Sequence, residues 1–468
     1  MKSFFKDLEY FSDSIALTTQ SEQITYSALI DEIKALSMHI RNRDLVFLIC
    51  ENSIESIVGY LTCLREGYIP LLIGSSIDEI LLQDLIKTYK PSYIWTKRNF
   101  EWVLDEWKNV YNNRSFHLLE KINKFEHIFH EDLAALLMTS GSTGSPILVR
   151  LSYENLNQNA ISIAQSLSIT RDDTPITTLP MNYTYGLSII NSHLLNGCEI
   201  ILTELSIISK EFWDIVSTKK VTTFGGVPYT YQMLKRLNFE KLNLNKISKL
   251  TQAGGKLDSN LVKYFSEHAH NKGIQFFVMY GQTEATARMS CLPAKDAMRK
   301  LGSIGLPIAK GEFFLIDEAN KIISEPEVVG ELHYKGPNVS MGYAYTVEDF
   351  IKGDDNKGVL ATGDMAMKDS DGYYYIVGRK KRFIKIFGNR ISLDEIENIL
   401  LKNQISVICA GVDDKLLIYT TQENGLNDIR LLISTKIGIH QSAISVNFIP
   451  EFPRNESGKI LYSKLQVN

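Results

Sequence analysis

Residues 45–73 read LVFLICENSIESIVGYLTCLREGYIPLLI, two apolar runs on either side of an amphipathic segment. The runs at 45–50 and 68–73 predict buried strands, and residues 54–65 predict the helix that joins them. Further strands are predicted at 176–179, 199–202, 222–224, 249–252 and 275–279. Further helices are predicted at 155–166, 187–195, 210–217, 229–237 and 259–268. Strands that alternate with helices predict an α/β fold with mostly parallel sheets and helices on both faces.

The length of the chain predicts more than one domain. Its 468 residues exceed the roughly 250–300 that a single core usually serves. After residue 302 the sequence becomes rich in glycine and in turn signals, which predicts a β-rich subdomain over about 302–378. A basic run, a helix at 394–401 and short strands follow. We therefore expect a large domain over 1–378, with two mostly parallel sheets and the β-rich subdomain, and a small α+β domain over 379–468.

Composition excludes several classes of protein. A net charge of -4 argues against nucleic-acid binding through bulk charge. The five cysteines are widely spaced without a CxxC pair, which favours buried thiols in a reducing compartment over disulfides or a zinc site. Acidic residues near the N-terminus argue against a signal peptide, and no apolar run of about 18 residues predicts a membrane span. The sequence predicts a soluble cytoplasmic protein.

An apolar strand runs directly into a loop of small and hydroxyl residues at 136–146, LLMTSGSTGSP. Such a loop can bring backbone N–H groups and hydroxyls against phosphate oxygens without obstruction by side chains. It is not a Walker A loop, because no Gly-Lys-Ser/Thr ends it. Alone, the motif fits a flexible Gly/Ser turn equally well. The loop residues of interest are Thr139, Ser140, Gly141, Ser142, Thr143 and Gly144.

Four further motifs are weak singly. YGQTEA at 280–285 offers an aromatic face, a hydroxyl and a carboxylate after an apolar strand, but it also fits a strand end followed by a helix cap. The acid of Thr-Gly-Asp at 362–364 can accept ribose hydroxyls, although this tripeptide is also a common turn. GRKKRFIK at 378–385 fits a solvated face or, less well, a nucleic-acid patch. Lys459 lies in a Gly-Ser turn near the C-terminus.

In this order, the motifs resemble the core motifs of the adenylate-forming superfamily, which contains acyl-CoA synthetases, peptide-synthetase adenylation domains and firefly luciferase. The resemblance extends from residues 67–72 to Lys459 and includes TQAGG at 251–255 and GEL at 330–332. It implies ATP-dependent ligation: a carboxylate attacks the α-phosphate of ATP, pyrophosphate leaves, and a thiol then takes the acyl group. This chemistry depends on positioning and charge neutralisation rather than on a side-chain nucleophile.

The resemblance also implies roles for individual residues. The loop from Thr139 to Gly144 would bind the β- and γ-phosphates, Thr283 the α-phosphate, and Glu284 Mg²⁺. Adenine would lie against Tyr280, Gly281 and Gln282, with Gly254, Gly255 and Lys256 along its edge. Asp364 and Arg379 would hold the ribose. Lys459 would bridge the acyl carboxylate and the phosphate, and Lys381 would be the hinge of a mobile C-terminal domain.

The segment LPMNYTYGL at 179–187 matches the family's border of the acyl pocket. Thr184 stands where amino-acid-activating relatives usually carry an aspartate, and burying an ammonium without a carboxylate is costly, so an α-amino acid is disfavoured. Aromatic walls with small gaps suit a short or mid-sized acid, hydroxylated or not. The predicted walls are Tyr183, Thr184, Tyr185, Phe224, Val227, Gly254, Met279 and Ala287. Val227 and Met279 fit the hydrophobic core equally well, and His193 is expected to be a core histidine.

Two departures from the family bear on function. Ile147 replaces the lysine that most relatives carry in the phosphate loop. Backbone donors are expected to suffice without it, and partial compensation by Arg150 is the alternative. The C-terminal domain is short, which favours an acyl carrier protein over CoA as the thiol, with the basic run as its docking site. An acyl-CoA ligase that uses free CoA is the alternative. An inactive nucleotide-binding relative is disfavoured, because Glu284, Asp364, Arg379 and Lys459 are all present.

Overall fold

The computed structural model of the chain describes residues 2–100, 106–139, 147–244, 246–380, 382–387, 389–455, 458 and 460–465. The chain divides into two compact units. The first unit comprises Met1–Glu312 and Lys335–Leu360, and the second comprises Phe313–Tyr334 and Ala361–Asn468. The five strands of the β-rich segment thus largely group with the C-terminal residues. The predicted domain boundary at 378/379 stays a prediction.

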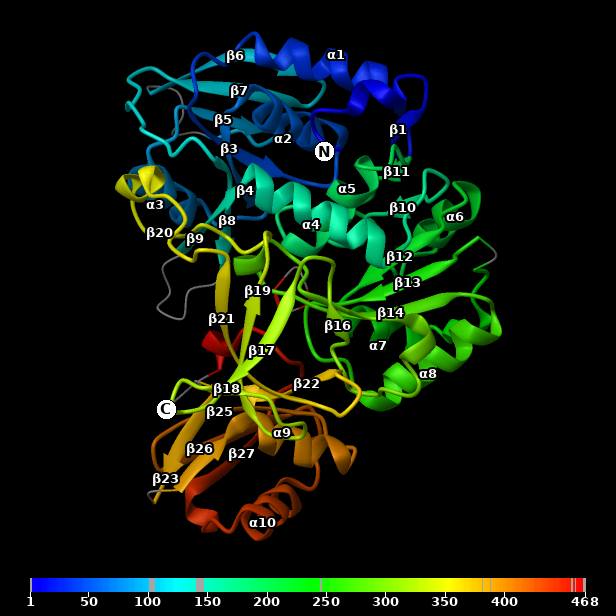
Figure 1. Cartoon of the computed structure of the whole chain (residues 1–468), viewed down its shortest axis with the longest axis vertical. Helices are drawn as coiled ribbons and strands as arrows, with labels where there is room; N and C mark the ends of the chain where they lie inside the picture. Colours follow the sequence, from blue (N-terminus) through cyan, green and yellow to red (C-terminus); the bar gives the residue numbers. More distant parts are fainter. Residues whose placement is uncertain are drawn as a thin grey trace. The chain divides into compact units, whose positions relative to one another are not determined.

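The first unit is built on two sheets (Figure 1). Sheet A has the strand order β16 (Leu306–Pro307), β15 (Ser290–Leu292), β14 (Gln275–Tyr280), β13 (Lys249–Gln252), β12 (Thr223–Gly226), β10 (Pro175–Ile176), β11 (Ile200–Ile201), β1 (Ile15–Thr18), β2 (Gln23–Thr25). Neighbouring strands from β14 to β1 are parallel. The outer strands β15, β16 and β2 pair antiparallel.

Sheet B has the strand order β20 (Gly342–Ala344), β9 (Ile147–Ser152), β8 (Leu133–Thr139), β4 (Ile69–Gly74), β3 (Leu45–Cys50), β5 (Tyr93–Thr96), β7 (Phe116–Lys121), β6 (Trp107–Asn113). Its centre, from β8 to β5, is parallel. The strands on both sides pair antiparallel. The connection between β6 and β7 is too short for the crossover that parallel strands need. The α/β class is therefore confirmed, with more antiparallel pairing in sheet B than the sequence predicts.

The helices of the first unit form three layers around these sheets. Between the sheets lie α1 (Tyr26–Ser37), α2 (Ile54–Glu66), α4 (Tyr153–Ser166) and α5 (Thr184–Leu194). The outer face of sheet B is covered by α3 (Glu79–Tyr89), and that of sheet A by α6 (Lys210–Thr218), α7 (Pro228–Arg236) and α8 (Ser259–Asn271). Side chains of Ser53 and Asp78 cap the starts of α2 and α3, and Gly67 ends α2 in the left-handed conformation.

Strand periodicity decides which layer a side chain joins. Phe277 and Met279 of β14 are buried between the sheets, whereas Phe276 packs against Tyr231 of α7 and Phe265 of α8. Successive side chains of a strand point to opposite faces, so β14 contributes to both layers. A near-continuous apolar run is therefore what its burial on both faces requires.

The second unit contains a twisted sheet, a hairpin and a small α+β layer. Sheet C has the strand order β18 (Ile322–Ile323), β17 (Glu312–Ile316), β19 (Gly330–Lys335), β21 (Val359–Lys368), β22 (Tyr374–Arg379). The hairpin pairs β23 (Phe383–Ile386) with β24 (Asn389–Ser392), and the last sheet has the order β25 (Val407–Val412), β26 (Lys415–Thr420), β27 (Ile444–Phe448). Helices α9 (Leu393–Lys402) and α10 (Leu426–Ile437) share a hydrophobic core with that last sheet.

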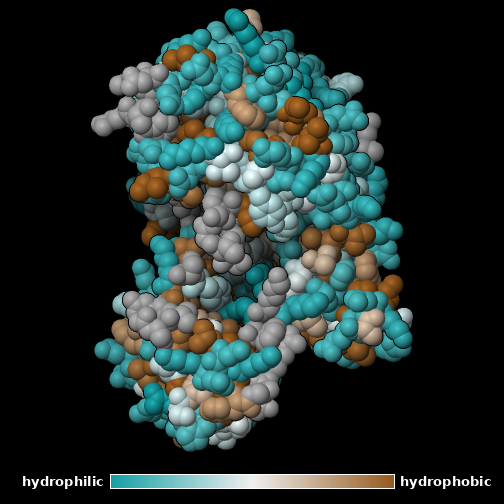
Figure 2. Space-filling view, turned by 90° about the vertical axis from the view of Figure 1, so that its left-hand side faces the viewer, coloured by the Kyte–Doolittle hydropathy of each residue, from teal (hydrophilic) through white to brown (hydrophobic). Residues whose placement is uncertain are grey.

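On the face shown in Figure 2, hydrophobic residues are interspersed with hydrophilic ones. Within the described ranges, none of the helices has the length and the apolar character that crossing a membrane requires.

Candidate active site

The predicted nucleotide residues of the first unit meet at one edge of sheet A. Parallel pairing aligns Gly226, Gln252 and Val278, so β12 and β13 end at the same level and β14 ends two residues beyond it, at the same edge. The residues that follow these strands include Val227, Gly254 and Thr283. The carboxyl edge of a parallel sheet is where ligands of α/β proteins bind. The topology therefore brings TQAGG and YGQTEA together, as their common chemistry predicts.

The chain reverses very tightly after β14. A Cβ atom at Gly281 would lie 1.6 Å from the backbone oxygen of Ala287, so only glycine fits there without a backbone shift. Thr283–Ala285 form a short 3-10 helix (η4), and Thr286 follows with φ 65° and ψ -58°. The N–H of Ala287 donates to the carbonyl of Ala285 at 2.7 Å. This is a γ-turn with a β-branched residue at positive φ, a strained conformation that its surroundings must hold in place.

A buried asparagine from another segment holds this turn. The Nδ2 group of Asn338 donates to the carbonyls of Ala285 and Arg288, both at 2.9 Å. The hydroxyl of Thr286 donates to the carbonyl of Asn338 at 2.7 Å. Asn159 of α4 also donates to the carbonyl of Arg288, at 2.9 Å. The sequence analysis missed Asn338, because a lone asparagine in a turn-rich segment carries no local signal of a distant partner.

Glu284 is positioned by the same segment. Its backbone oxygen accepts from the N–H of Ser340 at 2.9 Å, and its Oε1 accepts from the hydroxyl of Tyr343 at 2.9 Å. Tyr343 belongs to β20 of sheet B, so this contact joins the two sheets. Burial and the negative charge of Glu284 raise the pKa of Tyr343, which keeps its hydroxyl a donor. A carboxylate oriented in this way is suited to bind a hard cation.

The predicted adenine residues lie on neighbouring strand ends. The side chain of Gln282 donates to the hydroxyl of Tyr280 at 3.3 Å, and that of Gln252 donates to the carbonyl of Gly255 at 2.8 Å. Gly254 has φ +82°, and a Cβ there would come within 2.4 Å of the hydroxyl of Tyr183. Gly254, Gly255 and Lys256 are exposed. Gly254 thus allows the backbone to approach the predicted acyl pocket closely.

Several predicted acyl-pocket residues surround the start of α5. Tyr183 and Tyr185 lie edge to face, with ring centroids 6.4 Å apart, and the hydroxyl of Tyr185 donates to the carbonyl of Thr251 at 2.8 Å. Burial raises the pKa of Tyr183 to about 12, so both hydroxyl groups act as neutral hydrogen-bonding groups. Val227 and Met279 are buried in the same core, which fits both a role as pocket wall and a role as ordinary core residues.

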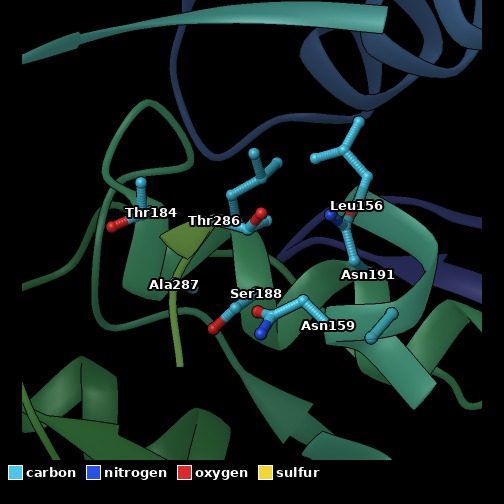
Figure 3. A pocket seen from close by; sticks show the side chains of 9 residues that line it. Leu156, Asn159, Thr184, Ser188, Asn191, Thr286 and Ala287 are labelled. Carbon is cyan, nitrogen blue, oxygen red and sulfur yellow. The ribbon is translucent and has the colours of Figure 1, made fainter. Parts of the chain in front are cut away.

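A cavity of about 10 Å³ lies beside this cluster, roughly the space of one water molecule. Figure 3 shows Thr184, Ser188 and Asn191 of α5 on its wall, with Thr286 and Ala287 from the turn after β14. Asn159 of α4 closes it from another side. Of the predicted pocket residues, Thr184 and Ala287 line this cavity. A bound acid would have to displace side chains around it.

Phe224 lies apart from this cluster. Its ring stacks on Trp213 at 6.3 Å and meets Phe212 edge to face at 6.0 Å, both from α6. A Cβ at the next position, Gly225, would approach the hydroxyl of Tyr185 at 3.2 Å, so Phe224 points to the opposite face of sheet A. The strand was predicted correctly, but its facing was not evident from the sequence. His193 is a core histidine, as expected: it is buried, and burial lowers its pKa to about 4.

The predicted ribose residues lie together in the second unit. Asp364 of β21 and Arg379 of β22 are cross-strand partners, and Arg379 Nε lies 3.3 Å from Asp364 Oδ1. The N–H of Asp364 donates to the hydroxyl of Thr362 at 3.1 Å. The carboxylate is buried, while most of the arginine side chain is exposed. An oriented acid beside an arginine can bind vicinal hydroxyls.

Comparison with known proteins assigns the chain to a family. The sequence profile of the family described as AMP-binding enzyme matches residues 4–344. The chain belongs to this family. It is an ATP-dependent, acyl-adenylate-forming acid–thiol ligase.

The chain matches its relatives over nearly its whole length. It is 26% identical over 449 residues to the 2-succinylbenzoate–CoA ligase of Oceanobacillus iheyensis, covering 91% of this chain and 89% of that protein. It is 26% identical over 478 residues to the corresponding ligase of Bacillus cytotoxicus, covering 97% and 95%. Its fold matches the O-succinylbenzoate coenzyme A synthetase (MenE) of Bacillus subtilis in complex with AMP, with a TM-score of 0.81 and 21% identity, covering 100% of this chain and 98% of that one.

Arg150 does not take the place of the missing loop lysine, so that alternative is wrong. The Arg150 side chain is 0% exposed. Its Nη2 donates to the carbonyl of Met341 at 2.8 Å and pairs with Asp355, and its Nε donates to the carbonyl of Tyr343 at 3.0 Å. Arg150 therefore connects β9 to β20 and to the segment that contains Asp355, and the donor groups of its guanidinium are occupied.

The remaining predicted site residues lie outside the described residues. These are Ser140, Gly141, Ser142, Thr143, Gly144, Lys381 and Lys459. Thr139 ends β8, and its hydroxyl donates to the carbonyl of Ile147 at 3.3 Å. Across the part of the chain that the structure describes, no group of three or more His, Cys, Asp or Glu side chains could hold a metal ion.

Proposed function

We propose that the enzyme is an acyl-CoA ligase, which converts a carboxylic acid, ATP and CoA into acyl-CoA, AMP and pyrophosphate. The observation that carries the proposal is the match of nearly the whole chain to CoA ligases, together with the strained turn that presents Thr283 and Glu284. A carboxylate oxygen forms a bond to the α-phosphorus while the bond to pyrophosphate breaks. The CoA sulfur then forms a bond to the acyl carbon as the bond to AMP breaks.

Positioning supplies most of the catalysis in this scheme. Thr283 holds the α-phosphate from the start of η4, and Tyr280 stacks on adenine, with Gly254, Gly255 and Lys256 along the edge of the base. Asp364 and Arg379 hold the ribose. Glu284 would provide one carboxylate for Mg²⁺, which prefers a protein carboxylate together with phosphate oxygens as ligands. Magnesium would neutralise phosphate charge as pyrophosphate leaves.

The donor set around Glu284 fits that ion. One carboxylate from the protein suits Mg²⁺, which usually keeps waters and substrate phosphates as ligands rather than a cage of protein groups. A similar structure, the B. subtilis synthetase with ATP and magnesium, has a TM-score of 0.78 and 22% identity and covers 99% of each chain. In the present chain the hydroxyl of Tyr343 fixes one oxygen of Glu284 and thereby the direction of the other.

Replacing Tyr343 by phenylalanine is expected to lower kcat/KM for MgATP by about tenfold, because a hydrogen bond to an ionised carboxylate is lost. The change is measured as ATP–pyrophosphate exchange at varied MgATP. Tyr345→Phe is the matched control, since the Tyr345 side chain is 58% exposed. Equal rates for Tyr343→Phe and Tyr345→Phe would contradict the positioning of Glu284 by Tyr343.

CoA is favoured over a carrier protein as the thiol. The preference for a carrier protein rests on a C-terminal domain that looks short, yet the chain spans 98% of a coenzyme A synthetase of known structure. Two described cations of the predicted docking run are neutralised as well: Lys380 pairs with Glu331 at 2.7 Å, and Arg382 pairs with Glu397 at 2.6 Å. Paired cations offer an acidic carrier little unmatched charge.

The test is ATP–pyrophosphate exchange over a panel of carboxylic acids, followed by thioester formation with CoA or with a phosphopantetheinylated carrier protein. Exchange with at least one acid, and acylation of CoA, are the expected results. Acylation of the carrier but not of CoA would overturn the acceptor and leave adenylation standing. Silence over a broad panel in an enzyme that binds ATP would overturn the ligase proposal.

A further inference from the structure

Arg288 is a buried cation that the sequence analysis did not single out. It lies between the γ-turn at Thr286 and β15, and it is 2% exposed. Its Nη2 donates to the hydroxyl of Ser188 at 3.1 Å, and its guanidinium carbon lies 4.3 Å from the ring centroid of Tyr185. Its Nε is buried without a hydrogen-bond partner. No carboxylate in the described ranges pairs with it.

Two other buried cations of this unit are neutralised by carboxylates. Arg150 pairs with Asp355 and occupies its remaining donors with backbone carbonyls. Lys249 lies 2.7 Å from both carboxylate oxygens of Asp173. A buried charge without a partner is strongly unfavourable, and an arginine remains charged rather than losing its proton. Arg288 differs from these two, because its partners are a hydroxyl and an aromatic face.

The position of Arg288 connects this missing partner to the acid substrate. Ser188, which accepts its hydrogen bond, lines the small cavity together with Thr184 and Ala287 (Figure 3). Ala287 is its neighbour in sequence, and Tyr185, which it stacks on, is another predicted pocket residue. The guanidinium group therefore borders the predicted acyl pocket, and the charge it presents there is positive. This sign repels an ammonium group and attracts an anion.

We propose that Arg288 binds a second carboxylate on the substrate, so that the acid activated by this enzyme is a dicarboxylate. One carboxylate takes the adenylyl group, and the other accepts two hydrogen bonds from the planar fork of Arg288. Tyr183 and Tyr185, whose rings lie edge to face, belong to the same predicted pocket, which suits an acid whose carboxylates are joined by an apolar or aromatic spacer. The inference rests on the proposed ligase function and specifies its substrate class.

The test compares matched acids in the full-length enzyme. Each dicarboxylic acid of the exchange panel is paired with the analogue in which one carboxylate is replaced by a methyl group. The wild-type enzyme is expected to favour the dicarboxylate by about 100-fold or more in kcat/KM, because a site built around a buried donor rejects an analogue that leaves it unpaired. Arg288→Gln is expected to bring the ratio near one, chiefly through KM, with ATP binding unchanged.

Controls separate this role from a structural one. Arg236→Gln changes an exposed arginine on α7 and is expected to keep the wild-type ratio. Arg288→Lys keeps the charge but loses the planar fork, and an intermediate ratio is expected. A dicarboxylate is also expected to raise the Tm of the wild-type enzyme and not that of Arg288→Gln.

Two results would overturn the inference in distinguishable ways. Wild-type exchange that is equal for both members of every pair would exclude the second carboxylate and leave the ligase function intact. Absence of exchange with every acid, in an enzyme that binds ATP, would overturn the ligase function and the substrate class together.

Discussion

Replacing Lys459 by alanine is expected to lower the rate of acyl-adenylate formation by about 100- to 1,000-fold, the usual effect of removing one charge-stabilising group. Negative charge moves onto the departing pyrophosphate as the carboxylate attacks the α-phosphate. A lysine ammonium that bridges the carboxylate and the phosphate stabilises that charge as a compact point charge. Attack of a thiol on the acyl-adenylate develops its charge at the acyl carbonyl and on AMP. That half-reaction is expected to be nearly unchanged.

Two assays separate the half-reactions. ATP–pyrophosphate exchange reports adenylation, and thioester formation from synthetic acyl-adenylate and CoA reports the second step. Lys464→Ala is the matched control, because Lys464 is an exposed lysine of the same terminal segment. If Lys459→Ala slows both half-reactions equally, the prediction that Lys459 acts in adenylation alone would be wrong.

Helix α9 contacts residues on both sides of position 381. The N–H of Arg379 donates to Asp394 of α9 at 2.7 Å, and Arg382 pairs with Glu397 of the same helix at 2.6 Å. Lys380 pairs with Glu331 of sheet C at 2.7 Å. Movement about Lys381 stays a prediction.

Much of the fold follows from local sequence, because burial imposes a regular spacing on the apolar residues of each strand and helix. The apolar runs at 45–50 and 249–252 are β3 and β13 with the predicted bounds. Helix α5 begins at Thr184 rather than at 187, since its first turn has no apolar stripe and no side-chain cap to mark it. The grouping of TQAGG and YGQTEA also follows from the sequence, because parallel strands place their carboxyl ends at one edge. Their roles in nucleotide binding are implied by the family resemblance and stay predictions.

The residues that complete the site depend on tertiary contacts that no local pattern encodes. Tyr343 binds Glu284 from the other sheet, and Asn338 binds two carbonyls of a turn about 50 residues away in sequence. The alternative role for Arg150 failed for the same reason: its charge is visible in the sequence, but its partner Asp355 is not. Arg288 stands in an unremarkable run of small and apolar residues. Only its burial identifies it.

Replacing Gly281 by alanine is expected to lower the free energy of unfolding by about 3 kcal/mol or more and to abolish adenylation, because overlap with fixed backbone is among the most destabilising changes. The new Cβ would lie 1.6 Å from the oxygen and 2.7 Å from the carbon of the Ala287 carbonyl. That carbonyl cannot easily retreat, since the Ala287 N–H closes the γ-turn and Asn338 binds the carbonyls on both sides of it.

Gly273→Ala is the matched control for this substitution. Gly273 has φ +69°, and a Cβ there would meet nothing within 4 Å. Its replacement is expected to cost about 1 kcal/mol of backbone strain without loss of exchange activity. Chemical denaturation measures both variants, and ATP–pyrophosphate exchange follows the site. If Gly281→Ala were as stable and as active as Gly273→Ala, the turn after β14 would be free to relax. The strained geometry that presents Thr283 and Glu284 would then not be a requirement for adenylation.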